Sequence, residues 1–255
     1  MKPSTAIFYA VILALILGCK KETTVSKIAP TTTIEAPKSV INPNPFPGFD
    51  VANNNTQDNY GCVGHVHNER GEFIGSGVLI APAVVLTAGH VIEGSSLLYF
   101  ITKDKAYLIE KSIIHPEYHI NNEIENDLGI LILSEGCDEI PAKMIKDKSE
   151  LTQREDLTTV GFSDQIKKIS KKGTFWYYGT LEEEPQYMKF LPLNGHIWFG
   201  DSGGAVFEDG GKLAGIISAV TVMDCTIIDQ SAIRLDLYLE WISRIMQQET
   251  CISNE

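Results

Sequence analysis

Residues 73–90 read FIGSGVLIAPAVVLTAGH and contain two runs of aliphatic residues that meet at Pro82. Runs this short, rich in Val and Ile and bounded by Gly or Pro, are typical of β-strands. The stretch therefore predicts two consecutive strands, and it ends on a histidine, His90, just beyond the second one.

Similar runs lie on both sides of this stretch, and a polar segment at residues 143–154 divides them. Before the segment they are VGHVH, LLYFIT, AYLIEKSIIH and DLGILIL; after it they are LTTVGFS, GTFWYYGT, YMKFLPL, GGAVFE and KLAGIISAVTV. Short strands with turn residues between them indicate an all-β barrel or sandwich. We expect two similar β halves in tandem, at about residues 55–145 and 150–234.

The C-terminal segment has a different pattern. Leu235, Leu239, Ile242 and Met246 recur at helical spacing, with Trp241 and Ile245 beside them. This periodicity predicts an amphipathic helix over about residues 235–248 that packs on the β halves.

The N-terminus resembles an export signal. Lys2 precedes the apolar stretch AIFYAVILALILG, which is too short to span a bilayer, so residues 1–18 are expected to be a signal peptide. Ile16-Leu17-Gly18-Cys19 resembles the lipobox of bacterial lipoproteins, which implies that Cys19 is acylated. Residues 19–48 are rich in Thr, Pro, Lys and Glu and are expected to form a disordered tether.

Composition excludes one class of partner. The 255 residues carry 33 acidic and 21 basic side chains, a formal net charge of −12, and such a chain repels a phosphate backbone. Nucleic-acid binding is therefore not expected.

Four cysteines remain besides Cys19, and an even number in an exported chain suggests disulfides. They allow three pairings, which spacing alone does not decide. We favour Cys62 with Cys137 and Cys225 with Cys251, because each pair lies within one half of the chain. Buried thiols are the alternative.

Three motifs carry the chemistry, and they occur in a fixed order: LTAGH at residues 86–90, DLGIL at 127–131 and GDSGG at 200–204. Together they resemble the catalytic motifs of the trypsin-like serine proteases, and the resemblance covers about residues 51–246. It implies two six-stranded antiparallel β-barrels with a C-terminal helix, in one peptidase domain at residues 49–250.

The resemblance assigns His90, Asp127 and Ser202 as a catalytic triad. The chemistry needs each of these residue types for a physical reason. A serine hydroxyl is barely nucleophilic at neutral pH, so it needs an imidazole base beside it. A buried carboxylate keeps that imidazole in the correct tautomer. The resemblance also implies an oxyanion hole made by the amides of Gly200 and Ser202. A buried His or a turn Asp without a catalytic role is the simpler alternative for each residue taken alone.

Substrate selection is expected to involve His196, Ser218 and Val220. His196 stands where trypsin has the aspartate that pairs with Arg or Lys of the substrate. Peptides with Arg or Lys at the cleavage site are therefore expected to be poor substrates. A preference for acidic substrate residues and a preference for uncharged ones are both compatible with the sequence. Val220 replaces a glycine that commonly lines the pocket wall, and Ser218 matches the family serine that bonds the triad aspartate.

One departure from the family concerns activation, and one further candidate site concerns metal binding. No basic residue precedes the segment around Val51, where zymogens are cut, so either another protease cuts there or Asp201 has another partner. His65 and His67 share one face of a predicted strand, a spacing compatible with a metal, although solvated side chains are expected there.

These observations predict a serine endopeptidase that acts on extracytoplasmic proteins through an acyl-enzyme, with no cofactor and no metal. Its partners are a protein or peptide substrate and, through the lipid anchor alone, a membrane. We expect a monomer that is exported, either secreted or held in the cell envelope as a lipoprotein. The alternative is an inactive protease fold that serves as a binding or adhesion module.

Overall fold

The fold was obtained as a computed structural model, which describes residues 60–103, 105–120, 124–151, 156–163, 169–178, 186–192, 196–223 and 226–252. The predicted signal peptide, the tether and Cys19 lie outside these residues, as does Cys225. Within the described residues, no helix has the length and apolar character needed to cross a membrane.

The first half of the chain forms a closed barrel in which the strands follow the order β1-β2-β3-β8-β5-β4. All neighbouring strands in it are antiparallel. Its strands are β1 (Val63–Asn68), β2 (Phe73–Ala81), β3 (Val84–Thr87), β4 (Leu98–Thr102), β5 (Lys105–Ile114) and β8 (Gly129–Leu133). A short helix and a two-stranded hairpin interrupt them: α1 (Gly89–Ile92), β6 (His119–Ile120) and β7 (Ile124–Glu125).

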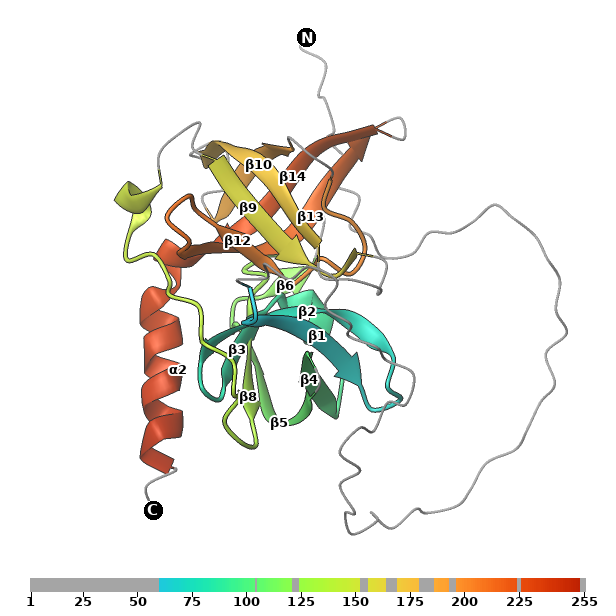
Figure 1. The fold of residues 1–255 in the computed structure, drawn as a ribbon, viewed down its shortest axis with the longest axis vertical. Coiled ribbons are helices and arrows are strands. Elements are labelled where there is room, and N and C mark those ends of the chain that lie inside the picture. Colours follow the sequence, from blue (N-terminus) through green and yellow to red (C-terminus); the bar gives the residue numbers. More distant parts are fainter. Residues whose placement is uncertain are drawn as a thin grey trace, which may run out of the picture.

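The second half forms another closed antiparallel barrel, with the order β10-β11-β14-β13-β12-β9. A 3-10 turn, η1 (Lys148–Glu150), precedes it. Its strands are β9 (Asp156–Gly161), β10 (Ile169–Tyr178), β11 (Tyr187–Pro192), β12 (Ala205–Phe207), β13 (Leu213–Met223) and β14 (Thr226–Arg234). The two barrels stack on one another (Figure 1). The predicted fold of two six-stranded barrels is thereby confirmed.

The C-terminal helix α2 covers Leu239–Ile252 and follows a 3-10 turn, η3 (Leu235–Leu237). It therefore begins later than the periodicity predicted, because the first apolar residues belong to the turn. The helix leaves the second barrel and runs beside the first one (Figure 1). Its buried face includes Trp241 and Ile242, which belong to the same apolar cluster as the first barrel.

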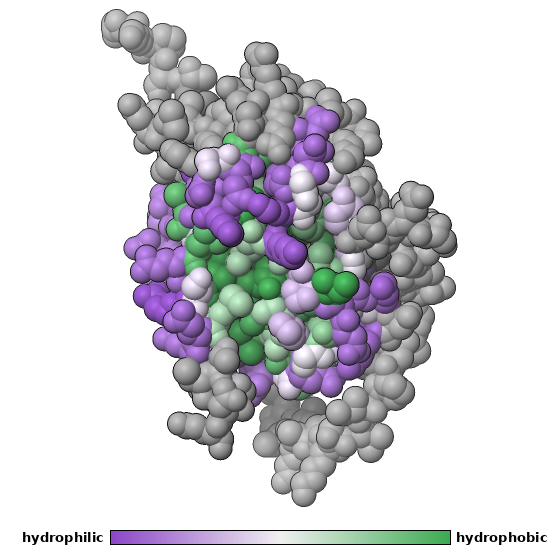
Figure 2. All heavy atoms as spheres, turned by 60° about the vertical axis from the view of Figure 1, so that its left-hand side comes forward, coloured by the Kyte–Doolittle hydropathy of each residue, from purple (hydrophilic) through white to green (hydrophobic). Residues whose placement is uncertain are grey.

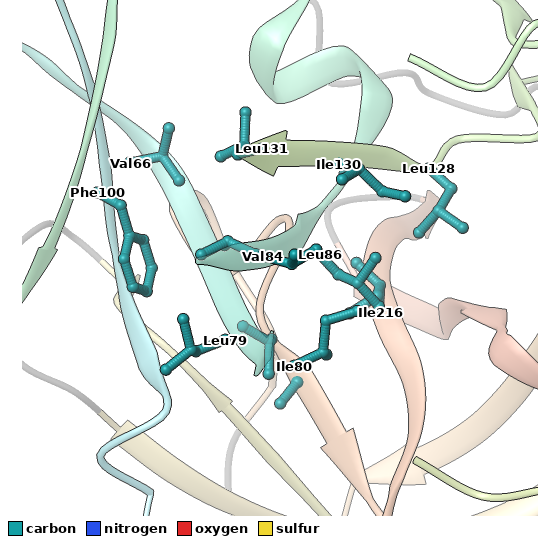
Figure 3. Packing of buried hydrophobic residues seen from close by; sticks show 14 of the residues in the cluster. Val66, Leu79, Ile80, Val84, Leu86, Phe100, Leu128, Ile130, Leu131 and Ile216 are labelled. Carbon is teal, nitrogen blue, oxygen red and sulfur yellow. The ribbon is translucent and has the colours of Figure 1, made fainter. Parts of the chain in front are cut away.

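That apolar cluster joins the two barrels. Figure 3 shows Ile216 of β13 beside Leu86 and Ile80, which belong to β3 and β2. Leu86 and Ile216 are both fully buried. Because burial of such side chains contributes about 1.5–3 kcal/mol each, the seam between the barrels is a stable part of the fold and can fix groups from both halves relative to one another.

Apolar side chains are exposed at several places among the described residues. Figure 2 shows one face on which hydrophobic side chains gather in the middle and hydrophilic ones surround them. Among the exposed large hydrophobic residues, Trp198 and Phe199 directly precede Gly200, with perpendicular rings 5.3 Å apart. Exposed aromatic side chains therefore lie beside the GDSGG motif.

Two expectations about individual side chains are wrong. Cys62 and Cys137 form no disulfide with each other. Both are buried thiols, which was the alternative to a disulfide for this pair. Both lie in the apolar cluster, where thiols pack as small hydrophobic groups. His65 and His67 are buried rather than solvated, with exposures of 2% and 0%, because their rings pack against Phe73.

Candidate active site

His90 lies on α1, immediately after strand β3, and two hydrogen bonds tie it to Asp127. The His90 amide N–H donates to Asp127 Oδ1 at 2.9 Å, and ring Nδ1 lies 2.8 Å from Asp127 Oδ2. A carboxylate only accepts hydrogen bonds, so Nδ1 carries the proton. In the neutral ring the lone pair is then on Nε2, as a general base requires.

Asp127 precedes β8 and is completely buried. Ser218 of β13 donates its hydroxyl to Asp127 Oδ2 at 2.5 Å, so the second barrel also contributes to this cluster. Burial by itself raises the pKa of Asp127, but the charge and hydrogen bonds of His90 and the Ser218 bond outweigh it. The pKa of Asp127 is therefore lowered, and the carboxylate stays ionised at neutral pH.

His90 is partly exposed, with 28% of its side chain accessible. Desolvation lowers its pKa, but the adjacent Asp127 charge, the hydrogen bond to it and the nearby Glu93 carboxylate together outweigh that effect. The pKa of His90 is therefore raised above 6.5. A base with a raised pKa takes up a proton more readily, and Asp127 stabilises the cation that forms.

Ser202 lies on the loop that precedes strand β12 of the second barrel, and both barrels anchor its backbone. Its carbonyl accepts the Ser76 amide at 2.8 Å, and the next residue, Gly203, donates its amide to Ile217 O at 2.8 Å. Ser76 is on β2 and Ile217 is on β13. The loop is thus held across the seam.

Gly203 brings this loop against the His90 segment. Its φ is +82°, and a Cβ there would lie 2.3 Å from Thr87 Oγ1 and 3.1 Å from Ala88 N. Only glycine allows that backbone shape and so close an approach. The structure therefore brings the Ser202 loop to the residues that directly precede His90. Among the described residues, no hydrogen bond links Ser202 Oγ to the His90 ring; such bonds often close only when substrate binds.

The predicted oxyanion amides lie on a tight turn. Asp201 donates its amide to Trp198 O at 3.0 Å, while Asp201 Oδ2 accepts the Trp198 amide at 2.9 Å. Gly200 within this turn has φ of +93°, and a Cβ would lie 2.4 Å from Phe162 O. In the part of the chain that the structure describes, the amides of Gly200 and Ser202 donate no backbone hydrogen bond. Their role in an oxyanion hole stays a prediction.

Asp201 has a partner within the fold. Its Oδ2 accepts the Ser163 hydroxyl at 2.5 Å in addition to the Trp198 amide. Of the two possibilities that the sequence left open, a partner other than a freed N-terminus is therefore present. The segment around Val51 lies outside the described residues.

The three residues predicted to select substrate differ in their surroundings. His196 is exposed, whereas Val220 is buried in an apolar cluster that also contains Ile197. Ser218 bonds Asp127. The geometry thus separates Ser218, which belongs with the His90 and Asp127 pair, from the other two, whose roles remain predictions.

Ser76 is a positioning residue that the sequence motifs do not indicate. Its hydroxyl donates to Gly200 O at 2.7 Å and accepts the Phe162 amide at 3.2 Å, in addition to the backbone bond to Ser202. One side chain of the first barrel therefore holds the Gly200 turn of the second. Its signal is a lone polar residue between Gly75 and Gly77 in an otherwise apolar strand.

The comparisons with known proteins agree on the class. The family model Trypsin matches residues 50–242, so the chain belongs to the trypsin family. Among the curated proteins, none matches this chain.

Solved structures share the fold at low sequence identity. Kallikrein-related peptidase 10 in complex with Zn2+ has a TM-score of 0.65 at 18% identity, over 74% of this chain and 97% of that one. Neuropsin, a serine protease of mouse brain, has a TM-score of 0.60 at 19% identity, over 74% and 95%. An inactive serine-to-alanine mutant of Rv3671c from M. tuberculosis has a TM-score of 0.57 at 14% identity, over 74% and 88%. The fold is that of trypsin-like serine proteases.

Proposed function

We propose that this protein is a serine endopeptidase in which Ser202 is the nucleophile, His90 the general base and Asp127 the residue that orients the base. The observation that carries the proposal is the bonding of His90 to Asp127 through both its ring and its amide. The amide bond holds the carboxylate against the His90 backbone, and the Nδ1 bond then orients the ring, which a base needs in order to take a proton from one particular hydroxyl.

The reaction follows from these groups. His90 Nε2 accepts the Ser202 hydroxyl proton as Ser202 Oγ attacks the scissile carbonyl carbon, which forms a tetrahedral oxyanion. The amides of Gly200 and Ser202 stabilise that oxyanion, and one such donor contributes about 3 to 4 kcal/mol. The His90 cation then protonates the leaving amine. Water hydrolyses the acyl-enzyme by the same steps, with His90 again as the base.

A fluorophosphonate probe tests the proposal, because it phosphonylates only an activated serine. We expect the full chain to be labelled, and the label and peptide hydrolysis to be lost in Ser202→Ala. Ser134→Ala is a matched control, since this serine lies after β8 in the first barrel. An unlabelled wild-type protein that is folded by circular dichroism would instead support an inactive binding module.

The proposal extends to location. The sequence of residues 1–19 supports export and acylation of Cys19, so the peptidase would act on extracytoplasmic proteins as a tethered monomer. Metabolic labelling with a radioactive fatty acid is expected to mark the wild type and not Cys19→Ala. Wild-type protein without label rules out the anchor.

A further inference from the structure

Gln230 is a polar residue in the wall of the second barrel, on strand β14. It pairs directly with Val220 on β13, and side chains that are directly opposite in an antiparallel pair lie on the same face. Its side chain is 1% exposed. A long amide side chain is therefore buried on the face that carries Val220, beside an apolar cluster.

The orientation of the Gln230 amide is fixed by one contact. The Ile197 backbone N–H lies 2.6 Å from Gln230 Oε1. Since a backbone N–H is a donor, the atom facing it has to be the carbonyl oxygen and not the NH2 group. The amide is therefore held with Nε2 on the other side.

Gln230 Nε2 is left without a partner. It is buried, and among the described residues no acceptor lies within hydrogen-bond distance of it. A buried donor without an acceptor costs about 1–3 kcal/mol, so buried polar groups in native proteins are nearly always paired. An orphaned donor held in place by its own carbonyl bond indicates a ligand that supplies the acceptor.

The donor lies between two segments that carry the candidate site. Ile197, which bonds Gln230, belongs to the segment that leads into the Gly200 turn and Ser202. Val220, opposite Gln230, follows Ser218 on the same strand, and Ser218 bonds Asp127. The unpartnered amide is therefore held between the segment that leads into Ser202 and the strand that carries Ser218.

We propose that Gln230 is a specificity-determining residue that donates a hydrogen bond from Nε2 to the side chain preceding the scissile bond. The ligand class is an uncharged side chain with an oxygen acceptor, best matched by glutamine. The proposal rests on the proposed peptidase function and names the substrate class of that site.

The surroundings select among acceptors. Ile197 and Val220 are buried apolar residues next to the amide. A carboxylate there would lose its hydration without gaining a cation, which is costly, whereas a neutral carbonyl gains a donor at small desolvation cost. An Arg or Lys side chain has hydrogen-bond donors but no acceptor, so it cannot pair with the NH2 group of Gln230. Neutral oxygen-bearing side chains are therefore favoured over both charged classes.

The test is a set of fluorogenic peptides that differ only in the residue before the scissile bond: Gln, Met, Glu and Arg. Met has nearly the shape of Gln but is at most a weak acceptor, so the Gln to Met ratio of kcat/KM isolates the hydrogen bond. We expect wild-type protein to prefer Gln over Met by about 10- to 100-fold. Equal rates for Gln and Met overturn the proposal without any variant.

Gln230→Glu is the matched variant, because it keeps the oxygen that accepts the Ile197 amide and replaces the NH2 group by a second oxygen. Because a buried Glu can keep its proton near neutral pH and still donate a hydrogen bond, the variant is assayed at about pH 10, where the carboxylate is ionised. There we expect it to lose the Gln preference at least 10-fold and to gain hydrolysis of the Arg peptide. An unchanged Gln to Met ratio in this variant overturns the proposal.

Fluorophosphonate labelling of Ser202 separates the two proposals. It reports the activated serine whatever residue precedes the scissile bond. A labelled wild type that does not distinguish Gln from Met contradicts the role of Gln230 and leaves the peptidase proposal standing. An unlabelled wild type contradicts both.

Discussion

The two barrels contribute to the candidate site by different physical means. The first barrel supplies His90 and Asp127, which are joined directly through a side chain and an amide. The second supplies Ser202 on a loop whose shape depends on two glycines with positive φ, Gly200 and Gly203, and on contacts to β2. The His90 and Asp127 pair is therefore fixed mainly by bonds to one carboxylate, whereas the Ser202 loop depends mainly on its backbone shape.

Stability and activity are therefore linked differently in the two barrels. A side-chain bond can be altered without moving the backbone, so changes in the first barrel can reduce activity while the fold persists. A backbone turn packed against another barrel cannot change without moving its neighbours, so changes in the second barrel should affect stability and activity together.

The largest expected effect is that of Asp127→Asn. The amide keeps the size of the carboxylate, but its NH2 group cannot accept the His90 Nδ1 proton, so the base loses its tautomer and its counter-charge. We expect kcat to fall about 10⁴-fold. Peptide hydrolysis at pH 8 measures the loss, and circular dichroism checks that the variant is folded. A loss of less than tenfold would show that Asp127 does not orient the base.

A smaller effect, on stability as well as activity, is expected for Gly203→Ala. The added Cβ would meet Ser76 O and Thr87 Oγ1 at 2.1 and 2.3 Å, in a backbone conformation with φ of +82°. Strain and overpacking together are expected to cost about 3 to 5 kcal/mol and to lower Tm by about 10 °C. Thermal unfolding followed by circular dichroism provides the measurement.

Gly211→Ala is the control for that experiment. Gly211 has nearly the same φ, +84°, but nothing lies within 4 Å of its Cβ position. Only the backbone strain remains, about 1 to 2 kcal/mol, and activity should be unchanged. If the two variants lose the same stability, then the seam contact at Gly203 contributes nothing and the contrast between the barrels fails.

The mildest change is a shift of pH. His90 has to be neutral to act as the base, and its pKa is raised because the Asp127 charge and hydrogen bond outweigh desolvation. Activity is therefore expected to fall about tenfold per pH unit below a midpoint that lies above pH 6.5. The profile of kcat/KM against pH measures that midpoint in the free enzyme. A midpoint below pH 6.5 would mean that Asp127 does not stabilise the protonated form of His90 in the free enzyme.

Much of the architecture could be predicted from the sequence, but one informative strand could not. The run at Thr226–Arg234 has no clear strand pattern in the sequence, because Gln230 and Ser231 interrupt its apolar residues. Both are buried in the barrel, where Gln230 Oε1 accepts the Ile197 amide and Ser231 Oγ donates to Ala219 O at 3.2 Å. Their partners lie on other segments, so local patterning carries no signal for them.

The class of the protein could be inferred from its amino-acid sequence alone. Short β-branched runs specify strands through local sterics, and the order of the motifs at His90, Asp127 and Ser202 identifies the family. Three features emerge only from the folded chain: Ser76 holds the Gly200 turn, Cys62 and Cys137 are not bonded to each other, and Gln230 keeps a buried donor. Local patterns carry no signal for them, because the residues involved are far apart along the chain and meet only when the barrels close and their strands pair.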